Sequence, residues 1–143
     1  ILPWPYEKII FYQSDFVRGP PNHEKVHFLE IEESSKIIHF KEGNWELTEN
    51  LVIPKGYEFV CNKNVTIDLL NNSSIFSYSP IKFIGSNDKL IKIYSSDLSG
   101  QGLLVLNTDR KSILEYVDFQ NKELQYLKIH QIPQQSPVCL LFL

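Results

Sequence analysis

Residues 51–94 read LVIPKGYEFVCNKNVTIDLLNNSSIFSYSPIKFIGSNDKLIKIY, and this stretch decides the fold. Short apolar runs follow one another here, separated by turn-forming spacers such as Pro54-Lys55-Gly56 and Asn62-Lys63-Asn64. Apolar and polar residues alternate within a run, as in Val65-Thr66-Ile67-Asp68-Leu69. A period of two places one side of a strand against a core and the other toward solvent. The stretch therefore predicts a series of short β-strands.

The same pattern continues on both sides of this stretch. No segment between the runs is long enough, or periodic at 3.6 residues, to form a crossover helix. The sequence therefore predicts an all-β fold. The expected strands lie at 37–40, 51–53, 57–61, 65–70, 81–84, 90–94, 103–106 and 113–119.

The expected strands also recur at a spacing of 24 residues. Leu51 plus 24 gives Ile75, and Ile67 plus 24 gives Ile91. A fixed period between about 20 and 50 residues is typical of stacked repeats. A repeat made of short strands without a helix indicates a solenoid whose strands pair in parallel with the coils above and below. We therefore predict a parallel β-helix, with an antiparallel β-sandwich as the alternative.

The 24-residue spacing predicts a register as well as a fold. On the outer surface it places Asp68 above Lys92 and Glu58 above Lys82, as ladder pairs between coils. The residues expected to point into the coil stack are Ile67, Leu69, Ile91, Ile93 and Val117.

Three segments are expected along the chain. Residues 1–35 are predicted to be an irregular N-terminal segment rich in proline, 36–121 the β-helix coils, and 122–143 an irregular C-terminal tail. The chain has no Met, begins at Ile1 and ends on the uncharged residues 138–143, so we expect it to be truncated. We then expect the last coil to expose unpaired strand edges and the isolated chain to associate in solution.

Residues 43–56, GNWELTENLVIPKG, carry a resemblance to a known family. A glycine, an apolar strand, the pattern L-x-I-P-x-G and a further strand resemble the first coil of right-handed parallel β-helix domains, often called pectin-lyase-like. Residues 81–85, 90–96, 100–106 and 112–121 are similar to the coils that follow. The chain is also similar to the β-helical region that follows the kinase-like domain in some spore coat protein H type proteins.

This resemblance covers residues 36–121 and implies a right-handed, single-stranded parallel β-helix of about three to four coils with an irregular N-terminal segment. It implies little about function, because the fold hosts many activities. No kinase motif is present in the sequence, so a phosphotransferase role is not carried over.

Composition narrows the classes of partner. The formal net charge is −3, and the Lys and Arg residues are spread among acids, which argues against nucleic acid or a polybasic membrane patch as a partner. No run reaches the roughly 18 apolar residues of a membrane span. Cys61 and Cys139 indicate neither a disulfide framework nor a metal site, and Cys61 is expected to be a buried thiol.

His23-Glu24-Lys25-Val26-His27 matches the zinc-protease pattern H-E-x-x-H. That chemistry needs both histidines on one face of a helix, with the glutamate beside a metal-bound water. Pro20-Pro21 precedes the pattern, no amphipathic helix surrounds it, and His39 and His130 lack the spacing of a third ligand. We therefore expect a solvated loop here, with no metal bound at His23 and His27.

Asn107-Thr108-Asp109 is similar to the N-T-D element of polygalacturonases, which are β-helical and use paired carboxylates. The accompanying elements of that family are absent. A lyase would need clustered acids with a base, yet Asp97, Asp118 and Arg110 are scattered along the sequence. We therefore interpret residues 107–110 as a polar turn.

Other motifs have simpler explanations. The glycosylation sequons at Asn64, Asn71 and Asn72 arise readily in Asn-rich turns. Residues 95–102 lack the following helix of a phosphate-binding loop and are expected to connect two coils. Tyr78, Tyr94 and Tyr116 are the aromatic residues that could stack on a sugar.

The sequence thus favours a non-catalytic β-helix module of a larger secreted or cell-envelope protein, without a cofactor. It would serve as a structural spacer or as a surface that binds polysaccharide or another protein. The alternative is a fragment of a polysaccharide lyase or glycoside hydrolase whose catalytic coils lie outside this segment. Convergent carboxylates with Lys or Arg on one outer sheet would favour that alternative, and the sequence alone does not assemble such a set.

Overall fold

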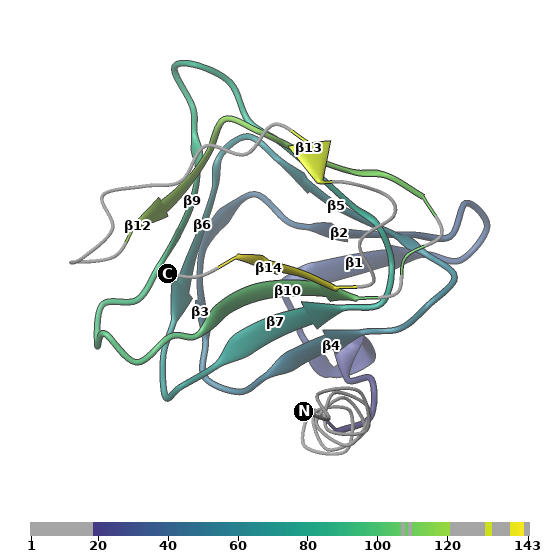
Figure 1. The fold of residues 1–143 in the computed structure, drawn as a ribbon, viewed down its shortest axis with the longest axis horizontal. Coiled ribbons are helices and arrows are strands. Elements are labelled where there is room, and N and C mark those ends of the chain that lie inside the picture. Colours follow the sequence, from purple (N-terminus) through teal and green to yellow (C-terminus); the bar gives the residue numbers. More distant parts are fainter. Residues whose placement is uncertain (1–18, 107, 109, 121–130, 133–137, 142–143) are drawn as a thin grey trace, which may run out of the picture.

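A computed structural model describes residues 19–106, 108, 110–120, 131–132 and 138–141. These residues form three sheets that run around a triangular coil (Figure 1). We call them sheets A, B and C, in the order in which the chain visits them. Sheet A contains β1 (Leu29–Glu32), β2 (Ile37–Phe40), β5 (Glu58–Asn62), β8 (Ile81–Ile84), β11 (Ser112–Glu115) and β13 (Gln131–Ile132). Sheet B contains β3 (Gly43–Leu47), β6 (Val65–Leu69), β9 (Ile91–Tyr94) and β12 (Val117–Gln120). Sheet C contains β4 (Leu51–Ile53), β7 (Ser74–Ser77), β10 (Gly102–Leu106) and β14 (Val138–Leu141).

The chain is a parallel β-solenoid of about three turns. Each turn takes one strand from each sheet, so that β2, β3 and β4 form the first turn and β5, β6 and β7 the second. Strands β8, β9 and β10 form the third, and β11 and β12 begin another. In Figure 1 the path from sheet A through B to C runs counterclockwise while the chain approaches the viewer, which is a right-handed winding. The predicted fold class is confirmed, and the antiparallel sandwich is wrong, because the strands of successive turns pair in parallel.

Alternating residues build the core inside the triangle. The five residues predicted to point inward, Ile67, Leu69, Ile91, Ile93 and Val117, are all buried. The rings of Phe40, Phe59 and Phe83 lie on successive strands of sheet A, with neighbouring centroids 5.1 and 5.3 Å apart. Cys61 is a free, buried thiol as expected, and burial raises the pKa of this thiol far above its ordinary range.

The predicted register is wrong, although the predicted orientation of the side chains is right. Ile67 lies opposite Ile93, so that Asp68 faces Tyr94 and Lys92 faces Thr66. Lys82 lies opposite Val60 rather than Glu58. The spacing of 24 holds between β4 and β7, whereas the loops between other strands are shorter or longer. These two errors are each two residues, an even number, so every side chain still falls on the expected side of its strand.

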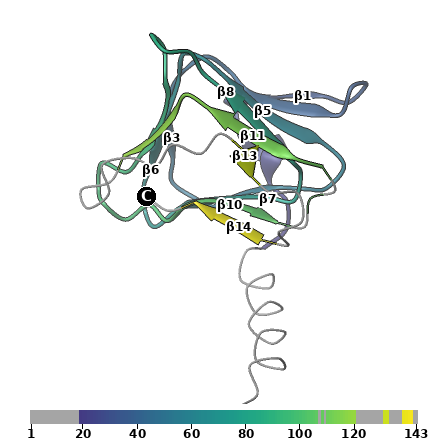
Figure 2. The same ribbon diagram turned by 45° about the horizontal axis from the view of Figure 1, so that its top comes forward.

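Both ends of the solenoid carry additional pairing. At the first coil, β1 pairs antiparallel with β2, while Asn22 Oδ1 accepts the backbone N–H of Val52 and Asn22 Nδ2 donates to Asn50 O. At the last coil, β13 and β14 pair antiparallel with β11 and β10 (Figure 2). The predicted open last coil is therefore wrong for sheets A and C. Residues expected to be irregular also form strands: β1 lies within 1–35, and β13 and β14 lie within 122–143.

Candidate binding face

The outer face of sheet A carries aliphatic and charged side chains side by side. One row across the strands runs from Glu30 on β1 through His39, Val60 and Lys82 to Ile113. Beside it lies a second row with Glu32, Ile37 and Glu58. The strand geometry explains the arrangement, because residues two apart point to the same face and neighbouring strands lie about 4.8 Å apart. None of these aliphatic side chains belongs to the core, since the alternate residues of each strand fill it.

This face is hollowed. A depression of about 410 Å³ crosses four strands, from β1 to β8. Its volume lies within the range of roughly 300–1,000 Å³ of ligand-binding clefts. The aliphatic part of its lining comes from Ile37, Val60 and Ile84, and the polar part from Glu32, His39, Glu58, Asn62 and Lys82.

Carboxylates gather at the β1 edge of the hollow. The His39 Nε2 atom lies 3.2 Å from a Glu30 carboxylate oxygen and 3.6 Å from one of Glu32. Both glutamate side chains are more than half exposed, and the Glu32 carboxylate also accepts the Ser35 hydroxyl. Neither carboxylate accepts a backbone N–H from a described residue, so both remain accessible to a cation.

A second polar cluster lies just beyond this edge. The Glu33 carboxylate accepts the Tyr57 hydroxyl at 2.8 Å and pairs with the Lys36 ammonium at 2.7 Å. These two hydrogen bonds lower the pKa of Glu33, and the same carboxylate raises the pKa of Tyr57. The cluster fixes the side chain of Tyr57 beside the hollow without closing it.

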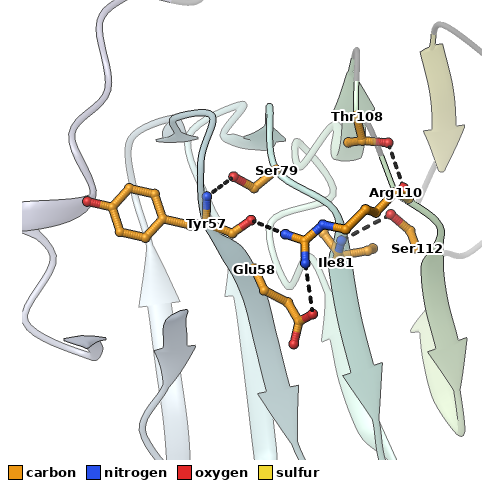
Figure 3. Close-up of polar contacts among 7 residues, drawn as sticks. All are labelled: Tyr57, Glu58, Ser79, Ile81, Thr108, Arg110 and Ser112. Atoms are coloured by element: carbon orange, nitrogen blue, oxygen red, sulfur yellow. Dashed lines mark hydrogen bonds and ion pairs between the residues drawn. The ribbon is translucent and has the colours of Figure 1, made fainter. Parts of the chain in front are cut away.

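Arg110, which lies just before β11, contacts Tyr57 and Glu58 at the start of β5 in the second turn (Figure 3). Its guanidinium donates to Tyr57 O at 3.4 Å and lies 4.0 Å from the Glu58 carboxylate. Beneath it, the Ser112 hydroxyl accepts the backbone N–H of Ile81, and the Ser79 hydroxyl accepts that of Tyr57. The two serines satisfy backbone donors at this corner, and Arg110 lies beside Glu58 on the outer face of sheet A.

Two further hollows lie elsewhere on the surface. One, of about 540 Å³, lies on the outer surface of sheet B and of the turns that precede its strands. Its lining is mostly polar and includes Asn44, Asn64, Asp88, Lys89 and Lys92. Another, of about 410 Å³, lies between the η1 turn (His23–Lys25) and the loop after β3. The first has Leu90 as its aliphatic lining residue. The second combines Val26 and Leu47 with charged groups, but it lies beside a turn and a loop instead of across neighbouring strands.

The H-E-x-x-H pattern does not form the geometry of a zinc site. Its residues make one 3-10 turn instead of an α-helix. The His23 ring is buried against the Tyr57 ring, and the His27 ring lies edge-on to Phe28 and Trp45. In the described part of the chain, no three His, Cys, Asp or Glu side chains gather as metal ligands would. The expectation that no metal binds at His23 and His27 stays a prediction.

The other sequence motifs are placed apart from the hollow. Asn107 and Asp109 lie outside the described residues, and the Thr108 hydroxyl donates to Arg110 O. Asp97, in the loop after β9, accepts hydrogen bonds from the Ser99 hydroxyl and from the backbone N–H groups of Asn71 and Ser99, and these bonds hold the pKa of Asp97 well below its ordinary range.

The remaining motif residues lie at corners or on sheet B. Asp118 accepts from Gln120 on β12. Asn64, Asn71 and Asn72 are exposed turn residues with positive φ. Tyr94 points outward on sheet B beside Asp68, whereas Tyr116 is a corner residue.

The candidate face was missed by sequence reasoning because its residues are far apart along the chain. The face is built by residues from different coils, namely Glu30, Glu58, Lys82 and Arg110. The 24-residue register also placed Lys82 opposite Glu58, whereas it lies opposite Val60. The sequence signal that could have indicated this face is an aliphatic residue at a position expected to point outward, such as Val60 between Phe59 and Cys61.

Comparison of the chain with protein-family models, with curated proteins and with solved structures found no match. No helix in the described residues is long and apolar enough to cross a lipid bilayer.

Proposed function

We propose that this chain is a non-catalytic β-helix module of a larger secreted or cell-envelope protein, and that the outer face of sheet A is its binding surface. The observation that carries the proposal is the hollow across β1, β2, β5 and β8, lined by aliphatic and charged side chains. The right-handed, pectin-lyase-like resemblance of residues 36–121 supports the proposal by analogy of fold alone.

Rigidity supports the same function. The strands that bear the hollow are anchored by the buried phenylalanines beneath them and by the serine contacts at the corner. A surface preorganised in this way loses little conformational entropy when a partner binds.

A panel of ligands tests the proposal. Immobilised polysaccharides, including uronic-acid polymers, and peptide arrays are exposed to the intact chain and to Val60→Glu, which places a charge in the middle of the hollow. The matched control is Thr66→Glu, a half-buried outward residue on sheet B. We expect a ligand whose binding is lost in Val60→Glu and retained in Thr66→Glu. Equal binding by both variants, or none by the parent chain, would contradict the proposed function.

A polysaccharide lyase or hydrolase fragment is the second candidate, and one observation favours it. The structure does bring carboxylates together with Lys82 and Arg110 on one outer sheet, which is the feature that the sequence alone could not assemble. Incubation with uronic-acid polymers separates the two functions. An unsaturated or shortened product that disappears in Glu58→Gln would establish catalysis, whereas binding without turnover would support the module.

A further inference from the structure

Charge is distributed unevenly over the hollow of sheet A. The exposed carboxylate of Glu32 lines it at the β1 edge with that of Glu30 beside it, and the exposed ammonium of Lys82 lines it on β8. The other carboxylate of its lining, that of Glu58 on β5, lies 4.0 Å from the guanidinium of Arg110. Lys82 forms no ion pair with any described residue. Between these opposite charges lies Val60, flanked by Ile37 and Ile84. A ligand that matches this face therefore needs a cation at one end, an aliphatic group in the middle and an anion at the other end.

The width of the face sets the length of such a ligand. Glu30, His39, Val60 and Lys82 form one row over four successive strands. Three inter-strand steps of about 4.8 Å give roughly 14 Å. An extended polypeptide advances about 3.4 Å per residue, so about four steps, or five residues, span the row, with the first, third and fifth side chains on the face turned to the sheet.

We propose that the outer face of sheet A binds an extended peptide segment that crosses the strands, with a Lys or Arg over Glu30 and Glu32, an aliphatic side chain over Val60 and an Asp or Glu at Lys82. This inference rests on the proposed function and names its partner. The aliphatic residue contacts Ile37 and Ile84 as well, and supplies affinity by burying apolar surface. The two terminal charges supply specificity and orientation.

The chemistry of the face favours a peptide over a polysaccharide. Sugar rings stack well on aromatic planes, but the outward residues of β1, β2, β5, β8 and β11 include none apart from the imidazole of His39. A polysaccharide of uronic acids would also place negative charge against Glu30 and Glu32.

Size argues against a second copy of the chain as the occupant. Four strands about 4.8 Å apart and five residues long cover roughly 300 Å². A stable protein–protein interface buries about 800 Å² on each partner. The face is therefore large enough for a short segment and too small for a stable dimer of this chain.

Fluorescence anisotropy with four labelled peptides tests the inference. The peptides share Gly-Ser flanks and contain Lys-Ala-Leu-Ala-Glu, Lys-Ala-Leu-Ala-Lys, Glu-Ala-Leu-Ala-Glu or Lys-Ala-Ser-Ala-Glu. For the parent chain we expect Lys-Ala-Leu-Ala-Glu to bind about two- to tenfold more tightly than each of the others, as expected for exposed ion pairs and one buried aliphatic group. Equal affinities for all four would overturn the inference.

A charge-reversal variant makes the test independent of stability. In Lys82→Glu the order should invert, so that Lys-Ala-Leu-Ala-Lys binds more tightly than Lys-Ala-Leu-Ala-Glu. The matched control is Lys92→Glu, an exposed outward lysine on sheet B, which should keep the parental order. An unchanged order in Lys82→Glu, or an inverted one in Lys92→Glu, would contradict the assigned position.

The remaining outcomes separate this inference from the proposed function. If no peptide binds but another ligand of the panel is lost in Val60→Glu, the peptide inference falls and the binding surface stands. If light scattering shows a dimer that Lys82→Glu dissociates, the occupant is a second copy and the peptide inference falls. If nothing binds, both proposals fall.

Discussion

Sheets A and B share one core but differ on their outer faces. On sheet B the outward rows are polar, with Asn44, Thr66, Lys92 and Asp118 in one of them. Sheet A instead alternates aliphatic and charged groups around a hollow. The inward residues of both sheets contribute to one apolar core, and the contrast lies on the outer faces.

The carboxylates of the two regions differ in the same way. On sheet B the buried Asp68 carboxylate accepts both the backbone N–H and the hydroxyl of Ser96, at 2.8 and 2.7 Å. It fixes the loop that follows β9. Glu30, Glu32 and Glu58 on sheet A contact only side chains of described residues. The Asp68 carboxylate on sheet B thus stabilises a loop, whereas the exposed carboxylates on sheet A remain available to a ligand.

The largest expected effect tests the shared core. Ile91→Glu places an unpaired charge inside the coil stack, where Ile91 is fully buried beside the strands of the neighbouring coils. We expect a loss of about 4 kcal/mol in the free energy of unfolding, measured by urea denaturation. The adjacent Lys92→Glu points outward and should change it by less than about 0.5 kcal/mol. Similar losses in both variants would mean that inner and outer faces are not distinguished as described.

A smaller effect is expected at the corner that precedes sheet A. The Ser112 hydroxyl is buried and accepts the backbone N–H of Ile81 at 3.0 Å (Figure 3). Ser112→Ala leaves that donor without its partner, and we expect a loss of about 1–3 kcal/mol in the same unfolding measurement. Thr108→Ala, which removes an exposed hydroxyl contact at 3.2 Å, is the control and should have little effect. If the two substitutions cost the same, the serine does not hold the corner.

The turn between the two sheets gives a third prediction. Tyr116 lies between β11 and β12 with φ of 54°, a conformation that a β-branched residue adopts at a cost. Tyr116→Val should therefore lower the free energy of unfolding by about 1 kcal/mol, whereas Tyr116→Gly should be near neutral. Thermal unfolding of the two variants checks this. A valine variant as stable as the glycine variant would show that the corner relaxes.

The smallest expected effect is on the pH dependence of stability and involves Asp97, in the loop that follows β9 of sheet B. Hydrogen bonds from Ser99 and from the Asn71 backbone hold the pKa of Asp97 below its ordinary value. A lowered folded-state pKa means that this stabilisation is complete above the ordinary aspartate pKa and is lost as pH falls through the folded value. Asp97→Asn should thus be less stable at neutral pH and should lose less stability on acidification. Parallel pH profiles of the two proteins would contradict the role of this carboxylate.

The sequence predicted the inside of the molecule better than its outside. Alternation alone identifies Ile67 and Ile93 as inward, because errors of two residues in register leave the orientation unchanged. Lateral neighbours depend on loop length, and loops carry no periodic signal. For this reason the Asp68–Lys92 and Glu58–Lys82 pairs were wrong.

Two further strand assignments depended on backbone geometry that the sequence does not reveal. Residues 113–119 were expected to form one strand, yet the positive φ of Tyr116 divides them into β11 and β12. Strand β7 was not recognised as a strand, because two of its four residues are serine and it follows the turn at 71–73. Its Ser77 hydroxyl donates to Ser79 O in the next corner. The hollow of sheet A depends on such details, so it could not be assembled before the fold was known.

The binding surface can be located by residue-resolved NMR of the backbone amides during titration with the Lys-Ala-Leu-Ala-Glu peptide. We expect the amide shifts to change along β1, β2, β5 and β8, with saturation at one common affinity, while β3, β6 and β9 of sheet B remain unperturbed. Shift changes centred on sheet B, or spread evenly over both faces, would contradict the assignment of sheet A as the binding surface.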